Sequence, residues 1–120
     1  IGSPPMNILP IQATNGSNLT RPMAAAHVGM RPEACMISVK RPAANGRMLH
    51  IDGELVTREA LGDQTLYKVQ TPYGQMQVKS FSSQLIPYGP VTVSAEAANL
   101  YFFDEGEQRI DMQARSVSAL

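Results

Sequence analysis

The stretch RMLHIDGELVTREALG, residues 47–62, decides the fold class of this chain. Its apolar residues and one glycine fall on one side of an extended chain: Leu49, Ile51, Gly53 and Leu55. The intervening positions are polar: His50, Asp52 and Glu54. A period of two with one polar face is typical of an antiparallel strand. Gly53 predicts a bulge or a sharp bend in that strand, and His50 is expected to be a solvated surface histidine.

The next stretch, TLYKVQTPYGQMQVKSF at residues 65–81, predicts a β-hairpin. Two alternating runs flank the segment TPYGQ, in which a proline precedes a glycine by two residues. That order of Pro72 and Gly74 suits a tight reversal of the chain. The loop SSQLIPYGP follows, and its prolines, Pro87 and Pro90, are expected to flank a strand rather than to lie in one.

The rest of the chain also favours short strands separated by turns. VTVSAE (residues 91–96) alternates in the same way, and HVGMRPEACMISV (residues 27–39) predicts two extended runs around a turn. The only predicted helix is the tail DMQARSVSAL, at residues 111–120. The pattern as a whole is that of an all-β barrel or sandwich.

Composition narrows the class of function. The 120 residues contain ten basic and ten acidic side chains, and this balance argues against a nucleic-acid-binding domain. The single cysteine, Cys35, excludes an internal disulfide and lies among apolar residues, which predicts a buried thiol. No apolar run approaches the roughly 20 residues that cross a bilayer, so no direct membrane insertion is expected.

No enzyme motif is present in the sequence. Neither His27 nor His50 has a cysteine or an acid at the spacing of a metal site. There is no phosphate-binding loop of the form GxxxxGK[ST] and no GxGxxG. Glu105 and Glu107 lie in a turn-like segment and are interpreted as solubilising charge. We therefore predict no catalytic, cofactor-binding or metal-binding residue and no cofactor in this chain.

Four motifs, taken in order, carry a resemblance to a known family. IGSPPMN at residues 1–7 resembles the junction after the nucleotide-binding domain in the ATPase subunits of carbohydrate-type ABC importers, and VGMRPEA at residues 28–34 resembles their GIRPEH motif. GELVTREALGDQTLYKVQT is similar to the strand–LG–strand pattern of the transport-associated oligonucleotide-binding-like (TOBE) domain. ANLYFFDEGEQRI resembles the closing segment of that domain.

The resemblance implies a small oligonucleotide-binding-like β-barrel with the shape of molybdate-binding modules. It implies a regulatory, dimer-stabilising C-terminal domain, similar to that of maltose, multiple-sugar and glycerol-3-phosphate importer ATPases. ATP and Mg²⁺ would then belong to an upstream domain, and this chain would be a C-terminal part of a longer subunit. The implied partners are a second copy of the subunit and the membrane permease, at the cytoplasmic face of the cell membrane.

The positions that match the family motifs are the candidate site residues. They are Ser3, Pro4, Met6, Asn7, Gly29, Arg31, Pro32, Glu33, Leu61 and Gly62. At the junction, two prolines supply a stiff exit from one domain into a strand of the next. Arg31 and Glu33 are interpreted as an intradomain ion pair or a backbone clamp on the turn, with a subunit contact as the alternative.

The expected organisation has three parts. Residues 1–46 form the junction and an irregular N-terminal lobe, residues 47–110 form the barrel, and residues 111–120 form the tail. A weak homodimer that buries barrel surface is expected, with the faces of residues 65–70 and 75–81 as the route. The alternative function is a small-ligand module that binds an oxyanion or a sugar.

Overall fold

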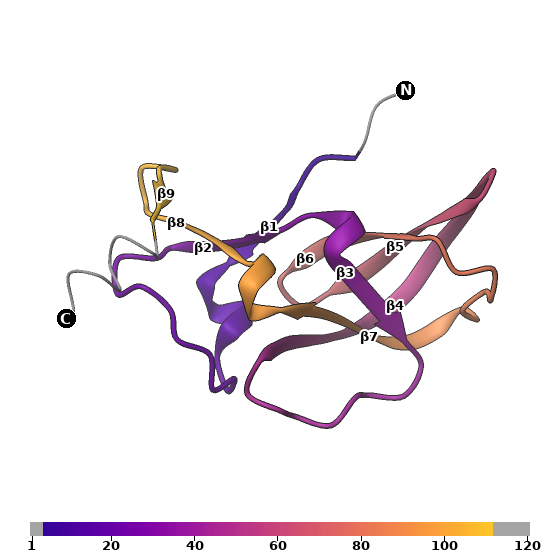
Figure 1. The fold of residues 1–120 in the computed structure, drawn as a ribbon, viewed down its shortest axis with the longest axis horizontal. Coiled ribbons are helices and arrows are strands. Elements are labelled where there is room, and N and C mark those ends of the chain that lie inside the picture. Colours follow the sequence, from indigo (N-terminus) through magenta and orange to yellow (C-terminus); the bar gives the residue numbers. More distant parts are fainter. Residues whose placement is uncertain (1–3, 112–120) are drawn as a thin grey trace.

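The computed structural model describes residues 4–111, and these residues form two β-sheets with three short 3-10 helices and no α-helix (Figure 1). The strands are β1 (Asn7–Pro10), β2 (His27–Met30), β3 (Cys35–Ser38), β4 (Met48–Leu61), β5 (Gln64–Thr71), β6 (Gly74–Ser80), β7 (Gly89–Glu96), β8 (Tyr101–Phe103) and β9 (Arg109–Ile110). The 3-10 helices are η1 (Ile11–Thr14), η2 (Pro32–Ala34) and η3 (Ala97–Asn99). The predicted all-β class is therefore confirmed, whereas the helix predicted in the tail falls on residues 112–120, outside the described part.

The larger sheet has the order β3-β7-β4-β5-β6 and every pair in it is antiparallel. β4 supplies its curvature, since residues 48–55 pair with β7 and residues 54–61 pair with β5. The sheet curls until η2 and β3, at one end of the order, lie against β6 at the other. This is the oligonucleotide-binding-like barrel that the family resemblance implies.

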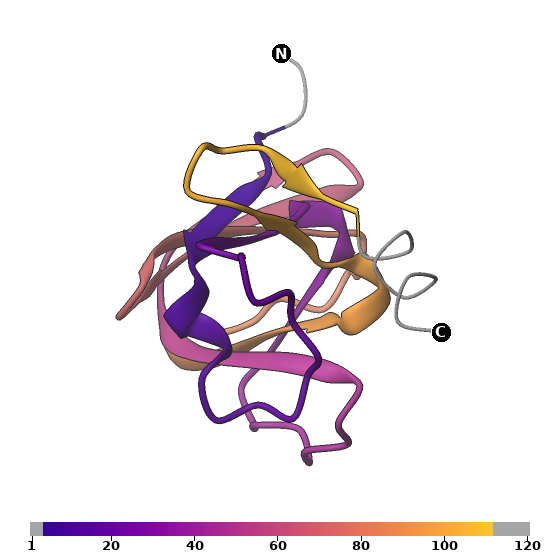
Figure 2. The same ribbon diagram turned by 90° about the vertical axis from the view of Figure 1, so that its left-hand side faces the viewer.

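The smaller sheet has the order β1-β2-β8-β9 and lies at one end of the molecule (Figures 1 and 2). β2 pairs with β8, and β3 pairs with β7, so strands from before residue 46 pair with strands from after residue 89. A single buried cluster joins the two sheets, and it includes Leu9 and Val28 from the smaller sheet and Tyr67 and Val69 from the larger one.

The hairpin predicted at residues 65–81 is confirmed. Pro72 and Tyr73 connect β5 to β6, and the Thr71 hydroxyl donates to the carbonyl of Gly74 across this turn at 2.7 Å. Gly62 and Asp63 connect β4 to β5, and Gly62 has φ of 70°, a left-handed conformation that suits the first position of a two-residue hairpin loop.

Two local predictions are corrected. The register shift in β4 lies between Leu55 and Thr57 rather than at Gly53. Gly53 instead permits close approach, because a Cβ there would lie 2.6 Å from the carbonyl oxygen of Gln70. Pro90 is the second residue of β7, not a flanking residue, and it is tolerated because β3 pairs with β7 only from Thr92 onward.

Candidate functional site

The side chain of Asn7 joins the smaller sheet to β6, the last strand of the larger one. Its Nδ2 donates to the carbonyl of Gln77 at 2.8 Å, and its Oδ1 accepts from the amide of Gln77 at 2.7 Å. The carboxamide thus pairs with β6 as a neighbouring strand would. Asn7 is 6% exposed, so these bonds satisfy groups that water does not reach.

Cys35 lies beside this clamp. The Asn7 Nδ2 lies 3.7 Å from the Cys35 sulfur, and the thiol donates to the carbonyl of Arg31 at 3.3 Å. Burial raises the pKa of the Cys35 thiol to about 12, although the Asn7 hydrogen bond acts in the opposite direction. The thiol is 6% exposed, which confirms the buried thiol predicted from the sequence, and its raised pKa keeps it protonated at neutral pH.

Gly29 is the point at which the N-terminal segment packs onto β2. A Cβ at Gly29 would lie 2.6 Å from the Met6 sulfur and 3.0 Å from both Ile8 Cδ1 and Phe103 Cε2. The three side chains close over the glycine, so its lack of a side chain is what lets Met6 lie down on the sheet. Pro4, which precedes this contact, is half-buried.

Arg31 and Pro32 form the transition from β2 into η2. Arg31 is extended, with φ of −75° and ψ of 144°, and Pro32 is buried at the first helical position. The carbonyl of Arg31 accepts from the amide of Ala34 at 3.0 Å. The Arg31 guanidinium lies 5.7 Å from the ring centroid of Tyr101, and Glu33 is exposed.

The structure thus places five motif positions in one junction cluster: Met6, Asn7, Gly29, Arg31 and Pro32. Arg31 and Glu33 do not form an ion pair, since the salt bridge found among residues 4–111 joins Arg41 to Asp52. Leu61 and Gly62 lie at the β4–β5 turn, outside the cluster. Ser3 lies outside the described residues.

A polar layer on the outer side of β4 and β7 was not predicted. His50 Nδ1 lies 2.7 Å from the hydroxyl of Ser94, and the hydroxyl of Thr92 donates to Asp52 at 2.8 Å. The Asp52 carboxylate also pairs with Arg41, which belongs to the segment connecting β3 to β4. The signal in the sequence was the polar alternation of both strands, but only the register brings these side chains opposite one another.

This layer corrects the prediction that His50 is solvated. His50 is half-buried, and its Nε2 is shielded from solvent and has no hydrogen-bond partner. The layer is not a catalytic triad, because Asp52 bonds Thr92 and Arg41, and Ser94 is only 2% exposed. The hydrogen bond from Thr92 is the main cause of the lowered pKa of Asp52, with Arg41 adding to it.

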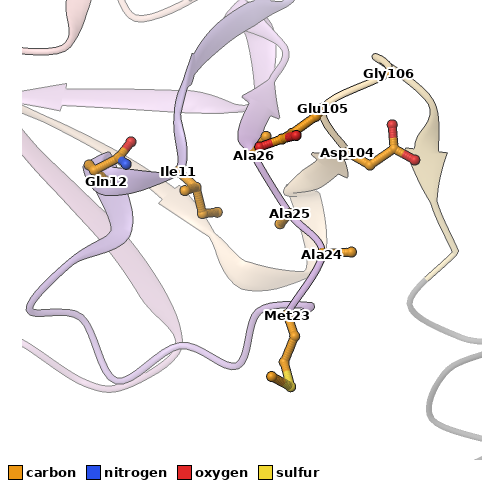
Figure 3. A pocket seen from close by; sticks show the side chains of 9 residues that line it. All are labelled: Ile11, Gln12, Met23, Ala24, Ala25, Ala26, Asp104, Glu105 and Gly106. Atoms are coloured by element: carbon orange, nitrogen blue, oxygen red, sulfur yellow. The ribbon is translucent and has the colours of Figure 1, made fainter.

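A groove of about 620 Å³ lies between residues 23–26 and the β8–β9 turn (Figure 3). The main chain of Ala24, Ala25 and Ala26 runs along one side of it, and Asp104 and Glu105 lie on the other. It contains no histidine, cysteine or basic side chain. The residues that line the groove therefore supply no nucleophile with a general base beside it.

No group of three or more histidine, cysteine or acidic side chains within residues 4–111 is arranged to hold a metal ion. In that part of the chain, no helix has the length and apolar character needed to cross a bilayer.

Comparison with known proteins identifies the family. Residues 28–103 match the family model of the TOBE domain, and this range begins at the strand that holds Gly29 and ends with β8. A search of curated proteins found no match. Because the match spans well over half of the 120 residues and agrees with the barrel described above, the chain belongs to the TOBE domain family.

Proposed function

We propose that this chain is the regulatory and dimer-stabilising C-terminal domain of the ATP-binding subunit of a bacterial ABC importer for sugars, polyols or glycerol phosphate. The observation that carries the proposal is the TOBE match together with the junction cluster. TOBE domains are typically C-terminal regulatory domains of ABC ATPases. In this role the domain itself catalyses nothing, and ATP and Mg²⁺ bind in a preceding domain.

The junction cluster supports this assignment in physical terms. A domain that responds to its neighbour needs a stiff connection to it, because a flexible linker would not transmit an orientation. Pro4 and Pro5 restrict the backbone, Met6 packs over Gly29, and Asn7 bonds the barrel edge at two points. A movement of the chain that precedes Met6 would therefore be transmitted to the smaller sheet through Gly29 and to the larger sheet through Gln77.

The partners follow from the same proposal. A second copy of the subunit would pair with this one, and the permease would be reached through the ATPase domain. The subunit would lie at the cytoplasmic face of the cell membrane, without contacting lipid through this domain.

The alternative, an oxyanion-binding or sugar-binding module, is less well supported. An oxyanion site needs converging donors, whereas the groove of Figure 3 presents the carboxylates of Asp104 and Glu105. Like charges would oppose an anion there.

The test is ATP hydrolysis by the longer polypeptide encoded by the gene, compared with the same polypeptide lacking residues 1–120. We expect the longer protein to hydrolyse ATP and the truncated one to retain hydrolysis but lose its regulation and part of its dimer stability. The 120-residue chain alone should hydrolyse none. A longer polypeptide that neither binds nor hydrolyses ATP would overturn the proposal.

A further inference from the structure

The outer face of the smaller sheet carries apolar and aromatic side chains on its solvent side. In β1, β2 and β8 the inward residues are buried, among them Leu9, Val28 and Phe102. The register places the alternate residues on the other side, and we call these the outer face: Met6, Ile8, His27, Gly29, Tyr101 and Phe103. Ile8 is 49% exposed, and Tyr101 and Phe103 are half-buried. Aromatic residues and methionine are enriched at protein interfaces.

Two arginine side chains meet over Tyr101, the first residue of β8. The guanidinium carbons of Arg31 and Arg109 lie 5.7 and 4.5 Å from the ring centroid of Tyr101. Both side chains are exposed, and neither forms an ion pair with a carboxylate of residues 4–111. Arg109 pairs with Phe103, the last residue of β8, but its guanidinium reaches back to Tyr101, so the ring holds two positive charges near the start of the strand.

Negative charge lies at the opposite end. β8 runs into the turn Asp104–Gln108, in which Glu105 and Glu107 are exposed. Arg31 follows β2, which is antiparallel to β8, so Arg31 lies beyond the start of β8 and the acidic turn lies beyond its end. The outer face therefore has a positive end and a negative end with apolar side chains between them.

We propose that two copies of this chain pack their outer faces together about a two-fold axis that lies between the two sheets, parallel to them and perpendicular to the strands. Such an axis sets the strands of the two copies antiparallel and brings the arginines of each copy over the acidic turn of the other. The contact is isologous, so each charge pair occurs twice. This proposal rests on the proposed function, because it identifies the surface through which the paired subunits would meet.

The outer side of β5 and β6, the route suggested by the sequence, is a poorer candidate. Its exposed or half-buried residues in the paired region are mainly glutamine and lysine: Lys68, Gln70, Gln75, Gln77 and Lys79. Lysine and other solvated polar groups are depleted at interface cores. The outer face of the smaller sheet has the apolar centre that this surface lacks.

The size of the face predicts weak pairing. Four strands spaced about 4.8 Å apart, each with a few residues of about 3.3 Å rise, cover on the order of 300 Å² per copy. Stable interfaces bury upwards of roughly 1,000 Å² in total. The isolated chain should therefore associate only at high concentration, and the charge arrangement should set the orientation more than the affinity.

The test is a charge exchange between two variants of the 120-residue chain, measured by sedimentation equilibrium at low salt. Arg31→Glu with Arg109→Glu makes both ends of the face negative, and Glu105→Arg with Glu107→Arg makes both ends positive. Each variant alone should lose self-association about tenfold or more, because like charges meet across the contact. An equimolar mixture should regain association, because every cross-copy pair is then of opposite sign.

The matched control is Lys40→Glu with Arg47→Glu, which changes net charge by the same amount at exposed residues outside the face. This control should lose less self-association than the Arg31 and Arg109 variant. Thermal unfolding checks that each variant is folded. If the variant with Arg31→Glu and Arg109→Glu does not fold, Arg31→Gln with Arg109→Gln takes its place, because it removes the same positive charges and should also weaken association.

The contact would be overturned by a wild-type chain that stays monomeric up to millimolar concentration, or by an equimolar mixture of the two exchanged variants that does not associate. It would also be overturned if the Lys40 and Arg47 control weakened association as much as the Arg31 and Arg109 variant does, or if Arg31→Gln with Arg109→Gln left association unchanged. None of these bears on ATP hydrolysis by the longer polypeptide, so the surface and the proposed function fail independently.

Discussion

At the scale of single residues, Asn7 makes the most specific contribution, because one side chain replaces a strand partner. Asn7→Ala removes two hydrogen bonds and leaves the backbone groups of Gln77 without them. Leaving such groups unpaired costs about 1–3 kcal/mol, so we expect a loss of about 2 kcal/mol in the free energy of unfolding. Urea denaturation measures it. Asn18→Ala, at an exposed asparagine, should be neutral, and an equal loss there would refute the clamp.

Gly29 tests the packing of the N-terminal segment. Gly29→Ala places a methyl group in contact with Met6, and overpacking of this kind costs about 1–3 kcal/mol. Met6→Ala combined with Gly29→Ala should recover part of the loss, since the flexible methionine is the nearest neighbour. A double-mutant cycle with no coupling between the two positions would contradict this contact. Gly106→Ala serves as the control, because its nearest neighbour would lie at 3.4 Å.

Cys35 makes stability depend on pH in the alkaline range. Its pKa is raised from 9.0 to about 12 in the folded state, so the folded protein holds the proton more tightly than the unfolded chain does. The resulting stability is complete below about pH 9 and is lost as the pH rises toward 12. Cys35→Ala should flatten this part of the stability curve. The native thiol should also resist alkylation at pH 8 until urea unfolds the chain, and rapid alkylation of the native protein would be inconsistent with its burial.

At the scale of elements, the segment that connects β3 to β4 passes from one side of β7 to the other. Arg41 in this segment pairs with Asp52 on β4 at 2.5 Å, and the side chains are 54% and 66% exposed. Exposed pairs contribute about 0–1 kcal/mol. Asp52→Asn should therefore leave global stability nearly unchanged while amides of residues 39–47 exchange faster. Glu54→Gln is the control, and equal exchange in the two variants would argue against a tether.

The pH dependence of this tether has the opposite sign to that of Cys35. The pKa of Asp52 is lowered, first by Thr92 and then by Arg41, so its contribution is present above the ordinary pKa of an aspartate and is lost as the pH falls. Protection factors of the amides in residues 39–47, which divide out the intrinsic pH dependence of exchange, should fall on acidification in the wild type and not in Asp52→Asn.

At the scale of the whole molecule, the strand pairing predicts which fragments fold. Residues 47–110 contain β4 to β9 but lack β3, the partner of β7, and β2, the partner of β8. They also lack the buried side chains of Leu9, Val28 and Met30. We expect this fragment to show no cooperative thermal transition, whereas residues 4–111 should show one. A cooperatively folded fragment 47–110 would mean that the barrel is independent of the N-terminal strands.

The sequence by itself determined the class of fold, the hairpins and the absence of an enzyme motif. Those features are local: alternation sets which side of a strand is apolar, and Pro72, Gly74 and Gly62 set where the chain reverses. The family motifs also identified Asn7, Gly29 and Arg31, although not what they contact.

Only the tertiary structure decided those contacts, because each one joins residues far apart in the chain. Asn7 meets Gln77, His50 meets Ser94, and Arg31 and Arg109 meet over Tyr101, through a register that depends on the whole sheet order. His50 illustrates the limit. Its place in the alternation predicted a side chain exposed to water, but β7 lies beside it and the hydroxyl of Ser94 lies within hydrogen-bond distance of its Nδ1. Burial depends on which strands become neighbours, and the period of a single strand does not contain that information.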